Sequence, residues 1–417
     1  MSTSKPGRSP HSSGWVIVTV KRPLLWTRGD KETWNLNPGR RYILNENQIE
    51  TFSKDVDTVS DLKTSEHYRQ LNCFEPIAGK RILIERYRER GLGDLMFFTG
   101  PMAWLQHHSN HQAKIHFYAL NARGAVFQGN PALEHKCAFV GPMEYDALVN
   151  YDFHWFSEVV TEYSEEQDQL NCYDAIFKQL GVDYRAIDPR FKRPHLYLLD
   201  EDYKAIQALF FYLEQQGAAN LNATPYYVVA PLSNSGLRTA SYQMWLDLIR
   251  ELSQEAPVIV MGSVNPIMPQ AGMTFEEFQA QLDAFEGPNV INLISNEIPI
   301  RTLMALVAKS RCFFGLDSGP LFFAQAFRVP AITLWGTHDP RVRIGYDPDY
   351  MELAIFNKGK CAAAPCYAYS GWPVHKCPQG ENQRVCEVLG SVSVNQILEK
   401  LEFAKEKHFA MKPLRPI

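Results

Sequence analysis

Residues 311–340 read RCFFGLDSGPLFFAQAFRVPAITLWGTHDP, in which two apolar runs are interrupted by Asp317, Ser318, Gly319 and Pro320. The first apolar run is short and ends in turn residues, so it predicts a buried strand. Ser318 is placed to cap a following helix and Pro320 suits its first turn, so LFFAQAFR predicts a helix and AITLWG the next strand. A strand, a helix and a second strand in this order are typical of a parallel sheet with right-handed crossovers.

The same alternation occurs in two series along the chain. The first begins with the strand GKRILIERY at 79–87, and the second begins near residue 200, with helices expected at 201–217, 299–309 and about 393–407 and a long polar insertion at 263–288. The fold class is therefore predicted as α/β, with two Rossmann-like doubly wound domains facing a cleft. We expect a disordered tail at 1–13, a small N-terminal β module and linker at 14–75, a first α/β domain at 79–195, a second at 200–390, and a C-terminal helix and tail at 391–417.

Composition narrows the class of protein. The chain has 417 residues, 45% of them hydrophobic and 21% charged, with a net charge of −4, which are ordinary values for a soluble globular protein. This charge gives no global basic field for nucleic acid or for an anionic membrane. No apolar run approaches the ~20 residues that a transmembrane helix needs. We therefore expect a cytoplasmic protein without a transmembrane segment, and composition leaves its oligomeric state open.

Three turns follow predicted strands, where folds of this class bind ligands. In the first turn, Gly91 and Gly93 would let the backbone approach a ligand closely, and the start of the next helix would attract an anion. Met96 stands where a dinucleotide-binding fingerprint needs a third small residue, which disfavours hydride-transfer chemistry. Asp94 has two interpretations, because a carboxylate there could either cap the helix or act as a general base.

The second and third turns carry groups that suit a phosphorylated ligand. PLSNSGLRTASYQMW offers the small polar groups of Ser233 and Asn234 and the guanidinium of Arg238, a set that fits a diphosphate or an ordinary polar loop. LDSGP at 316–320 opens a helix whose unpaired N–H groups favour an anion, and Asp317 could accept a hydrogen bond from a hydroxyl group. Three such turns at the ends of strands in two sheets are more informative together than any one of them.

The combination of ILIERYRERGLGD, PLSNSGLRTASYQMW and FFGLDSGPLFFAQAFRVPAITLWGTHDP resembles glycosyltransferase family 9, the ADP-heptose:lipopolysaccharide heptosyltransferase group, which has the GT-B architecture of two Rossmann-like domains. The resemblance covers about 80–400. It implies an inverting, metal-independent enzyme that moves a sugar from a nucleotide-sugar donor, held by the C-terminal domain, to an acceptor hydroxyl at the N-terminal domain. No cofactor besides the nucleotide-sugar co-substrate is implied.

The resemblance also assigns roles to residues. Asp94 matches the acid after the glycines and would be the general base. The donor-binding residues that it implies are Gly91, Gly93, Ser233, Asn234, Arg238, Asp317, Ser318, Gly319 and Pro320. Asn234 stands where a hydroxyl residue is usual, and Ser263 and its successors replace a glutamate that binds ribose in some members. The resemblance therefore does not fix the nucleotide.

The acceptor has two interpretations. A saccharide such as a lipopolysaccharide core fits the family, and a hydroxylated DNA base fits the extra N-terminal module, whose basic pairs Lys21-Arg22 and Arg40-Arg41 could grip a polymer in a phage-encoded enzyme acting in its host's cytoplasm. A third hypothesis is a non-catalytic binding protein on this scaffold. The presence of both Asp94 and the 317–319 turn argues against it.

Two further patterns could hold a metal. A structural zinc site is one interpretation of four cysteines whose spacing is irregular for such a site, Cys361, Cys366, Cys377 and Cys386. Asp347-Pro348-Asp349 imitates the acidic triplet of metal-dependent glycosyltransferases, although a proline-centred turn explains it better.

Overall fold

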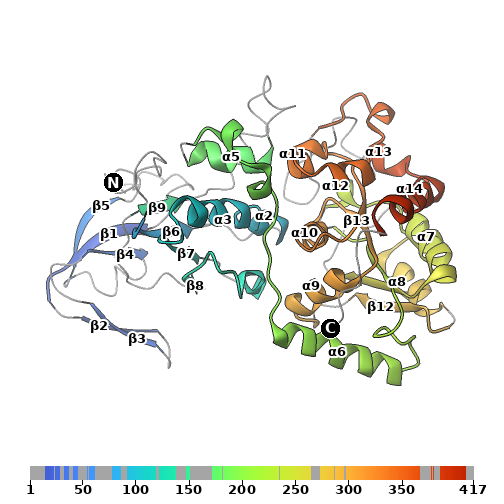
Figure 1. Ribbon diagram of the computed structural model, residues 1–417, viewed down its shortest axis with the longest axis horizontal. Helices are drawn as coiled ribbons and strands as arrows, with labels where there is room; N and C mark the ends of the chain where they lie inside the picture. The colour runs from blue at the N-terminus through green and yellow to red at the C-terminus, as the bar shows by residue number, and fades with distance from the viewer. Residues whose placement is uncertain are drawn as a thin grey trace, which may run out of the picture.

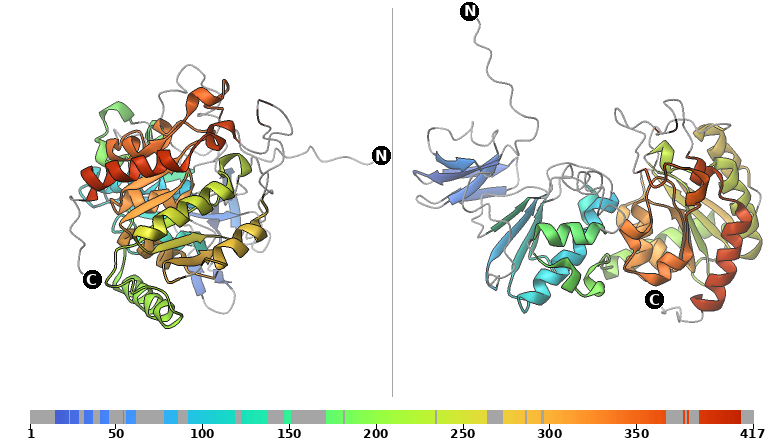
Figure 2. Two further views of the ribbon diagram at one scale, coloured as in Figure 1. Left: turned by 90° about the vertical axis from the view of Figure 1, so that its right-hand side faces the viewer. Right: turned by 90° about the horizontal axis from the view of Figure 1, so that it is seen from above.

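The computed structural model describes residues 15–22, 24–28, 32–36, 41–45, 54, 56–61, 78–85, 92–118, 122–137, 147–150, 171–180, 182–233, 235–263, 273–285, 287–294, 297–366, 377, 379 and 386–409. Within these ranges the chain forms a small β unit, a four-stranded sheet and a six-stranded sheet, which follow one another along the molecule (Figures 1 and 2). Both larger sheets are parallel and carry helices, so the α/β fold class is confirmed.

The N-terminal β unit is antiparallel. Its central strand pairs with two others, and a separate hairpin places Trp26 opposite Trp34. The strands are β1 (Trp15–Val20), β2 (Leu24–Arg28), β3 (Glu32–Leu36), β4 (Arg41–Asn45) and β5 (Val56–Asp61). Of the basic pairs that were expected to grip a polymer, Lys21 and Arg22 are exposed, Arg41 begins β4, and Arg40 lies outside the described residues.

The four-stranded sheet has the strand order β8-β7-β6-β9. Because β6 has later strands on both sides, the chain changes direction across the sheet beside it, and the turn that leaves β6 leads to the glycine-rich stretch before α2. The elements are β6 (Arg81–Glu85), α2 (Leu92–Met96), α3 (Thr99–His108), β7 (Lys114–Tyr118), η1 (Ala122–Phe127), β8 (His135–Cys137), β9 (Ala147–Asn150) and α5 (Cys172–Gln179).

The six-stranded sheet has the order β12-β11-β10-β13-β14-β15, which reverses direction between β10 and β13. Ala230 at the end of β10 lies beside Gly315 near the end of β13, so the turns at 231–239 and 317–320 leave the sheet side by side. Ligands bind at such reversal points in open parallel sheets. The strands are β10 (Tyr227–Ala230), β11 (Val258–Gly262), β12 (Val290–Ile294), β13 (Cys312–Leu316), β14 (Ala331–Leu334) and β15 (Ala354–Ile355).

Helices cover both faces of this sheet, and α7 and α14 lie together on one of them (Figure 2). The helices of this half are α6 (Asp200–Gln215), η4 (Gly236–Arg238), α7 (Tyr242–Glu255), α8 (Phe275–Asp283), α9 (Ile300–Lys309), α10 (Gly319–Ala326), α11 (Arg341–Ile344), α12 (Pro348–Leu353), η5 (Lys358–Lys360), α13 (Glu387–Gly390) and α14 (Val394–Lys407). The helices expected at 201–217, 299–309 and 393–407 are present as α6, α9 and α14.

The expectation of a polar insertion at 263–288 is wrong in part, because α8 forms within it. Thr274 and Glu277 cap its start reciprocally, and Phe278 and Leu282 bury one face of the helix against the core. Those apolar residues stand at helical spacing in a stretch whose overall polarity conceals them.

Two short turns, η2 (Tyr184–Ala186) and η3 (Pro189–Phe191), precede the segment that joins the two sheets. Arg301 of α9 ties this segment in place. Its guanidinium pairs with Asp202 at the start of α6, with a separation of 2.8 Å between Nε and Oδ1, and donates to the backbone carbonyls of Ala125, Gln128 and Tyr197 at 2.9–3.0 Å. One buried cation therefore connects the first sheet's loops, the joining segment and the second sheet's helices.

Replacing Arg301 with Met should lower the free energy of unfolding by about 3 kcal/mol, because Asp202 would remain buried without its charge partner. Denaturant titration of the full chain measures the loss. The matched control is Arg250→Met, which removes an exposed i,i+3 pair with Asp247 and should change stability by less than about 0.5 kcal/mol. Equal effects of the two substitutions would show that Arg301 is not a structural clamp.

Candidate functional site

The start of α2, which carries Gly93, and the LDSGP turn meet where α2 packs against α10. A Cβ on Gly319 would lie 2.9 Å from the Cβ of Leu92, and a Cβ on Gly93 would lie 2.8 Å from the ring of Phe322 and 3.7 Å from the Cα of Gly319. Neither position has room for a side chain, so each helix start packs a bare glycine against a side chain of the other helix. Turns that are more than 200 residues apart in the sequence therefore form one site.

Asp317 is the central charged group of this site. It ends β13 with 3% of its surface exposed. Arg343 Nε lies 3.2 Å from Oδ1, while Arg238 Nη1 and His338 Nδ1 each lie 3.5 Å from Oδ2. Arg238 also donates a hydrogen bond to the main-chain carbonyl of Asp317 at 3.0 Å.

The Asp317 carboxylate is surrounded by nitrogen atoms but is not saturated. Neither of its oxygens accepts a hydrogen bond from any residue in the described ranges, and the same holds for the buried hydroxyls of Ser233 and Ser318. Buried acceptors without donors are costly and are usually satisfied by a ligand or by water. This group of oxygens therefore has the composition expected of a binding site for hydroxyl or phosphate groups.

His338 is a neutral neighbour of Asp317. Burial lowers the pKa of His338 well below its usual value, and the charges of Arg343 and Arg238 lower it further. Thr337 Oγ1 lies 2.9 Å from its Nδ1. The contact with Asp317 is therefore one between a dipole and a charge, and the two arginines supply the positive charge beside the carboxylate.

Cys172 marks the point where the charges from both sheets converge. It begins α5 and is 1% exposed, and burial raises the pKa of its thiol to about 12. The charge of Arg343 opposes that shift of the pKa, while the charges of Asp317 and Asp94 add to it. A thiol with this pKa stays protonated, which excludes it as a nucleophile near neutral pH.

The predicted site residues lie as follows. Asp94 is half-buried in α2, inside the helix rather than before it, so the N-cap interpretation is wrong in position. Ser318 occupies the N-cap position of α10, with Pro320 in its first turn, but its side chain makes no capping bond. Gly91 and Asn234 lie outside the described residues.

Three residues of the site were not predicted: His338, Arg343 and Cys172. His338 and Arg343 follow β14, at the same edge of the sheet as the LDSGP turn, and this position is the signal that could have identified them.

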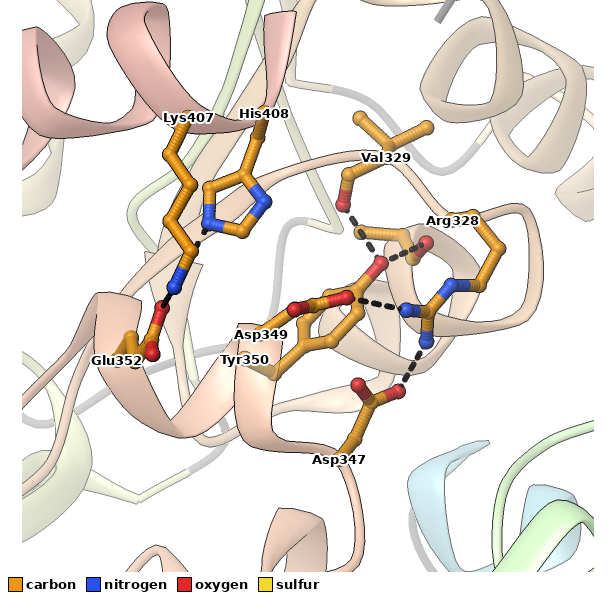
Figure 3. Close-up of polar contacts among 9 residues, drawn as sticks. Arg328, Val329, Asp347, Asp349, Tyr350, Glu352, Lys407 and His408 are labelled. Atoms are coloured by element: carbon orange, nitrogen blue, oxygen red, sulfur yellow. Dashed lines mark hydrogen bonds and ion pairs between the residues drawn. The ribbon is translucent and has the colours of Figure 1, made fainter. Parts of the chain in front are cut away.

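The acidic triplet lies in the cluster of ion pairs shown in Figure 3. Arg328 pairs with Asp347 and with Asp349, the latter at 2.6 Å, and Asp347 is the N-cap of α12 with Pro348 in the first turn. The Tyr350 hydroxyl donates to the carbonyls of Ala324 and Val329 at the end of α10. Both carboxylates are held by a guanidinium, which supports the interpretation of a turn.

The four clustered cysteines do not form a metal site within the described residues. Burial raises the pKa of Cys386, and the neighbouring Cys366 and Cys361 raise it further, so these three thiols are near one another. No group of three or more His, Cys, Asp or Glu side chains in the described ranges is arranged to hold a metal ion.

Two parallel α/β domains that meet through the turns at their strand ends define the GT-B class of glycosyltransferase fold. Residues 194–369 match the family model of glycosyltransferase family 9 (heptosyltransferase). This match confirms the resemblance that the sequence motifs indicated, and the chain is a glycosyltransferase. A comparison with curated protein sequences finds no match.

Solved structures agree on the fold. The iron-containing dodecameric glycosyltransferase TibC from enterotoxigenic E. coli H10407 has a TM-score of 0.55 at 16% identity, covering 95% of this chain and 93% of its own. TibC with ADP-D-beta-D-heptose has a TM-score of 0.53 at 15% identity, covering 94% and 91%. A family 9 glycosyltransferase from Veillonella parvula DSM 2008 (0.56, 14%, covering 79% and 98%) and E. coli ADP-heptose lps heptosyltransferase II (0.53, 15%, covering 78% and 98%) have the same fold. No helix among the described residues is long and apolar enough to cross a membrane.

Replacing Gly319 with Ala should lower the free energy of unfolding by about 1–3 kcal/mol, because the new Cβ would collide with Leu92. Gly359→Ala is the matched control: nothing lies within 4 Å of the new Cβ, and stability should be unchanged or slightly higher. Chemical denaturation measures both. A second substitution, Leu92→Ala, should recover part of the loss in the Gly319→Ala background, and a purely additive double variant would contradict the close contact.

Proposed function

We propose that this chain is an inverting, metal-independent glycosyltransferase that moves a sugar from a nucleotide-sugar donor to a saccharide hydroxyl. The observation that carries the proposal is the Asp317 carboxylate, which is buried between two arginines and accepts no hydrogen bond within the described residues. Its turn packs against the start of α2, the helix that carries Asp94, through Gly319 and Gly93. A heptose donor carried on ADP is the first candidate, because TibC binds ADP-D-beta-D-heptose. The donor would lie against the second sheet's turns and the acceptor against the first sheet.

In this mechanism Asp94 accepts the proton of the acceptor hydroxyl as that oxygen attacks the anomeric carbon. The new bond joins the acceptor oxygen to the anomeric carbon, and the bond from that carbon to the diphosphate oxygen breaks with its electron pair on the leaving group. Attack from the face opposite the leaving group inverts the anomeric centre. Asp317 accepts hydrogen bonds from sugar hydroxyls, and the Ser233 and Ser318 hydroxyls bind phosphate oxygens.

The leaving diphosphate needs positive charge, and the protein provides it without a metal in this proposal. Arg238 stands at the end of the 231–239 turn beside the start of α10, where backbone N–H groups also face the ligand. The Asp347 and Asp349 carboxylates, which would be the natural metal ligands, are already paired with Arg328. TibC is described as containing iron, whereas the mechanism proposed here uses only side chains and backbone groups of this chain.

Asp94→Asn should abolish sugar transfer while leaving the affinity for the donor unchanged, because an amide cannot accept the proton. Transfer is measured as release of the nucleoside diphosphate from ADP-, UDP-, GDP- and CMP-sugars in the presence of an acceptor, and donor affinity by calorimetry. The control is Asp188→Asn, an exposed carboxylate that caps η3 and pairs with Arg190; this variant should retain full activity. Transfer by Asp94→Asn at a near-normal rate would exclude it as the base.

The acceptor arm of the same assay compares a lipopolysaccharide core saccharide with DNA that contains hydroxymethylated bases. Transfer to the saccharide supports the proposal. Transfer to DNA alone would overturn the saccharide acceptor and would favour a DNA-modifying enzyme.

Transfer should proceed at an unchanged rate in excess EDTA, because in this proposal the positive charge at the leaving group comes from the Arg238 side chain and a helix start. The measurement is nucleoside diphosphate release before and after chelation, with Mg²⁺ and Mn²⁺ added back separately. Loss of activity that either ion restores would contradict the metal-independent mechanism.

A further inference from the structure

Arg343 is a buried cation that the proposed mechanism has not yet used. It lies in the short helix α11 and is 5% exposed. On one side its Nε lies 3.2 Å from Oδ1 of Asp317, and on the other its guanidinium carbon lies 5.6 Å from the ring centre of Phe97. Phe97 belongs to the segment between α2 and α3, so Arg343 lies where the two sheets' domains meet.

The two arginines around Asp317 have different positions. Arg238 faces Oδ2 and also bonds the main-chain carbonyl of Asp317, so it fixes the backbone of the turn. Arg343 faces the other oxygen, Oδ1, and is the ion-pair partner of that atom among the described residues. The orientation of the carboxylate therefore depends on both cations, one for each oxygen.

The contact between Arg343 and Asp317 leaves the carboxylate able to bind a ligand. At 3.2 Å the pair lacks hydrogen-bond geometry, and Oδ1 accepts no hydrogen bond from the described residues. A carboxylate forms charge-assisted hydrogen bonds with hydroxyl groups, and these are stronger than hydrogen bonds between neutral groups. The guanidinium thus supports the acceptor without occupying its lone pairs.

Phe97 makes this support depend on contact with the first domain. Its ring packs edge-on against Phe322 of α10, with 4.8 Å between centroids, and against Tyr173 of α5 at 5.3 Å. These contacts hold the ring against the guanidinium of Arg343. Arg343 therefore contacts the first domain through Phe97 while it lies beside Asp317.

We propose that Arg343 is a positioning residue that orients the Asp317 carboxylate toward a hydroxyl group of the donor sugar, and that it thereby sets selectivity for the sugar and not for the nucleotide. The inference rests on the proposed function and deepens it. It assigns sugar recognition to two side chains of the second domain: Asp317, in the turn after β13, and Arg343, in the short helix α11 after β14.

The test compares the affinities of ADP-D-β-D-heptose and of ADP alone by calorimetry. Arg343→Gln should weaken binding of the nucleotide sugar about 10- to 100-fold, because a charge-assisted hydrogen bond loses its orientation, while ADP affinity stays the same. Arg343→Lys keeps the charge and should recover part of the loss, which also covers the case of a Gln variant that fails to fold. A parallel loss of ADP affinity would show that Arg343 binds phosphate, and would overturn the proposal.

The control is Arg341→Gln, in the same short helix, whose exposed guanidinium pairs with Asp339 and should leave both affinities unchanged. The double variant Asp317→Asn with Arg343→Gln should bind the nucleotide sugar no more weakly than Asp317→Asn alone, because Arg343 acts through Asp317. Additive losses would overturn this inference while leaving the proposed function intact. If the wild-type chain does not bind ADP-D-β-D-heptose more tightly than ADP, both a heptose-ADP donor and this inference are contradicted. Transfer from another nucleotide sugar in the donor panel would still support the proposed glycosyltransferase function.

Discussion

The structure depends on the close packing of two glycines, each of which lies directly against a side chain of the opposite helix. Gly93 and Gly319 bring the starts of α2 and α10 together so closely that a single methyl group at either position would collide with its neighbour. This approach brings the helix that carries Asp94 against the turn that carries Asp317, although the two come from different sheets. Arg301 stabilises the same arrangement through separate contacts, which connect the segment between the two sheets to α6 and to η1 of the first domain. The charged groups of the site can therefore act together only while this contact persists.

Much of the fold is encoded locally and could be predicted. The LDSGP turn combines a strand end, an N-cap serine and a proline in the first helical turn, and each of these preferences acts over a few residues. The alternation of strands and helices likewise predicted two parallel sheets. By contrast, α8 was read as a polar insertion because only Phe278 and Leu282 of that helix are fully buried, and their neighbours are polar.

The site was predictable only in part, for a physical reason. Asp317 and Arg238 belong to turns that a pattern can identify, whereas Arg343 and His338 acquire their roles from the tertiary structure, which brings the end of β14 beside the end of β13. An arginine in a four-residue helix looks like a surface residue until the fold buries it. The acidic triplet shows the converse: Asp347 and Asp349 imitate metal ligands in sequence, but a distant Arg328 engages both.

The high pKa of the buried Cys172 thiol affects how easily that thiol can be oxidised. At neutral pH a thiol with a pKa of about 12 is ionised in roughly one molecule in 100,000, and oxidants such as peroxide attack the ionised form. The sulfur atom next to the charged groups of the site therefore behaves as a small apolar filler. The buried thiol of Cys172 is therefore a poor target for such oxidants.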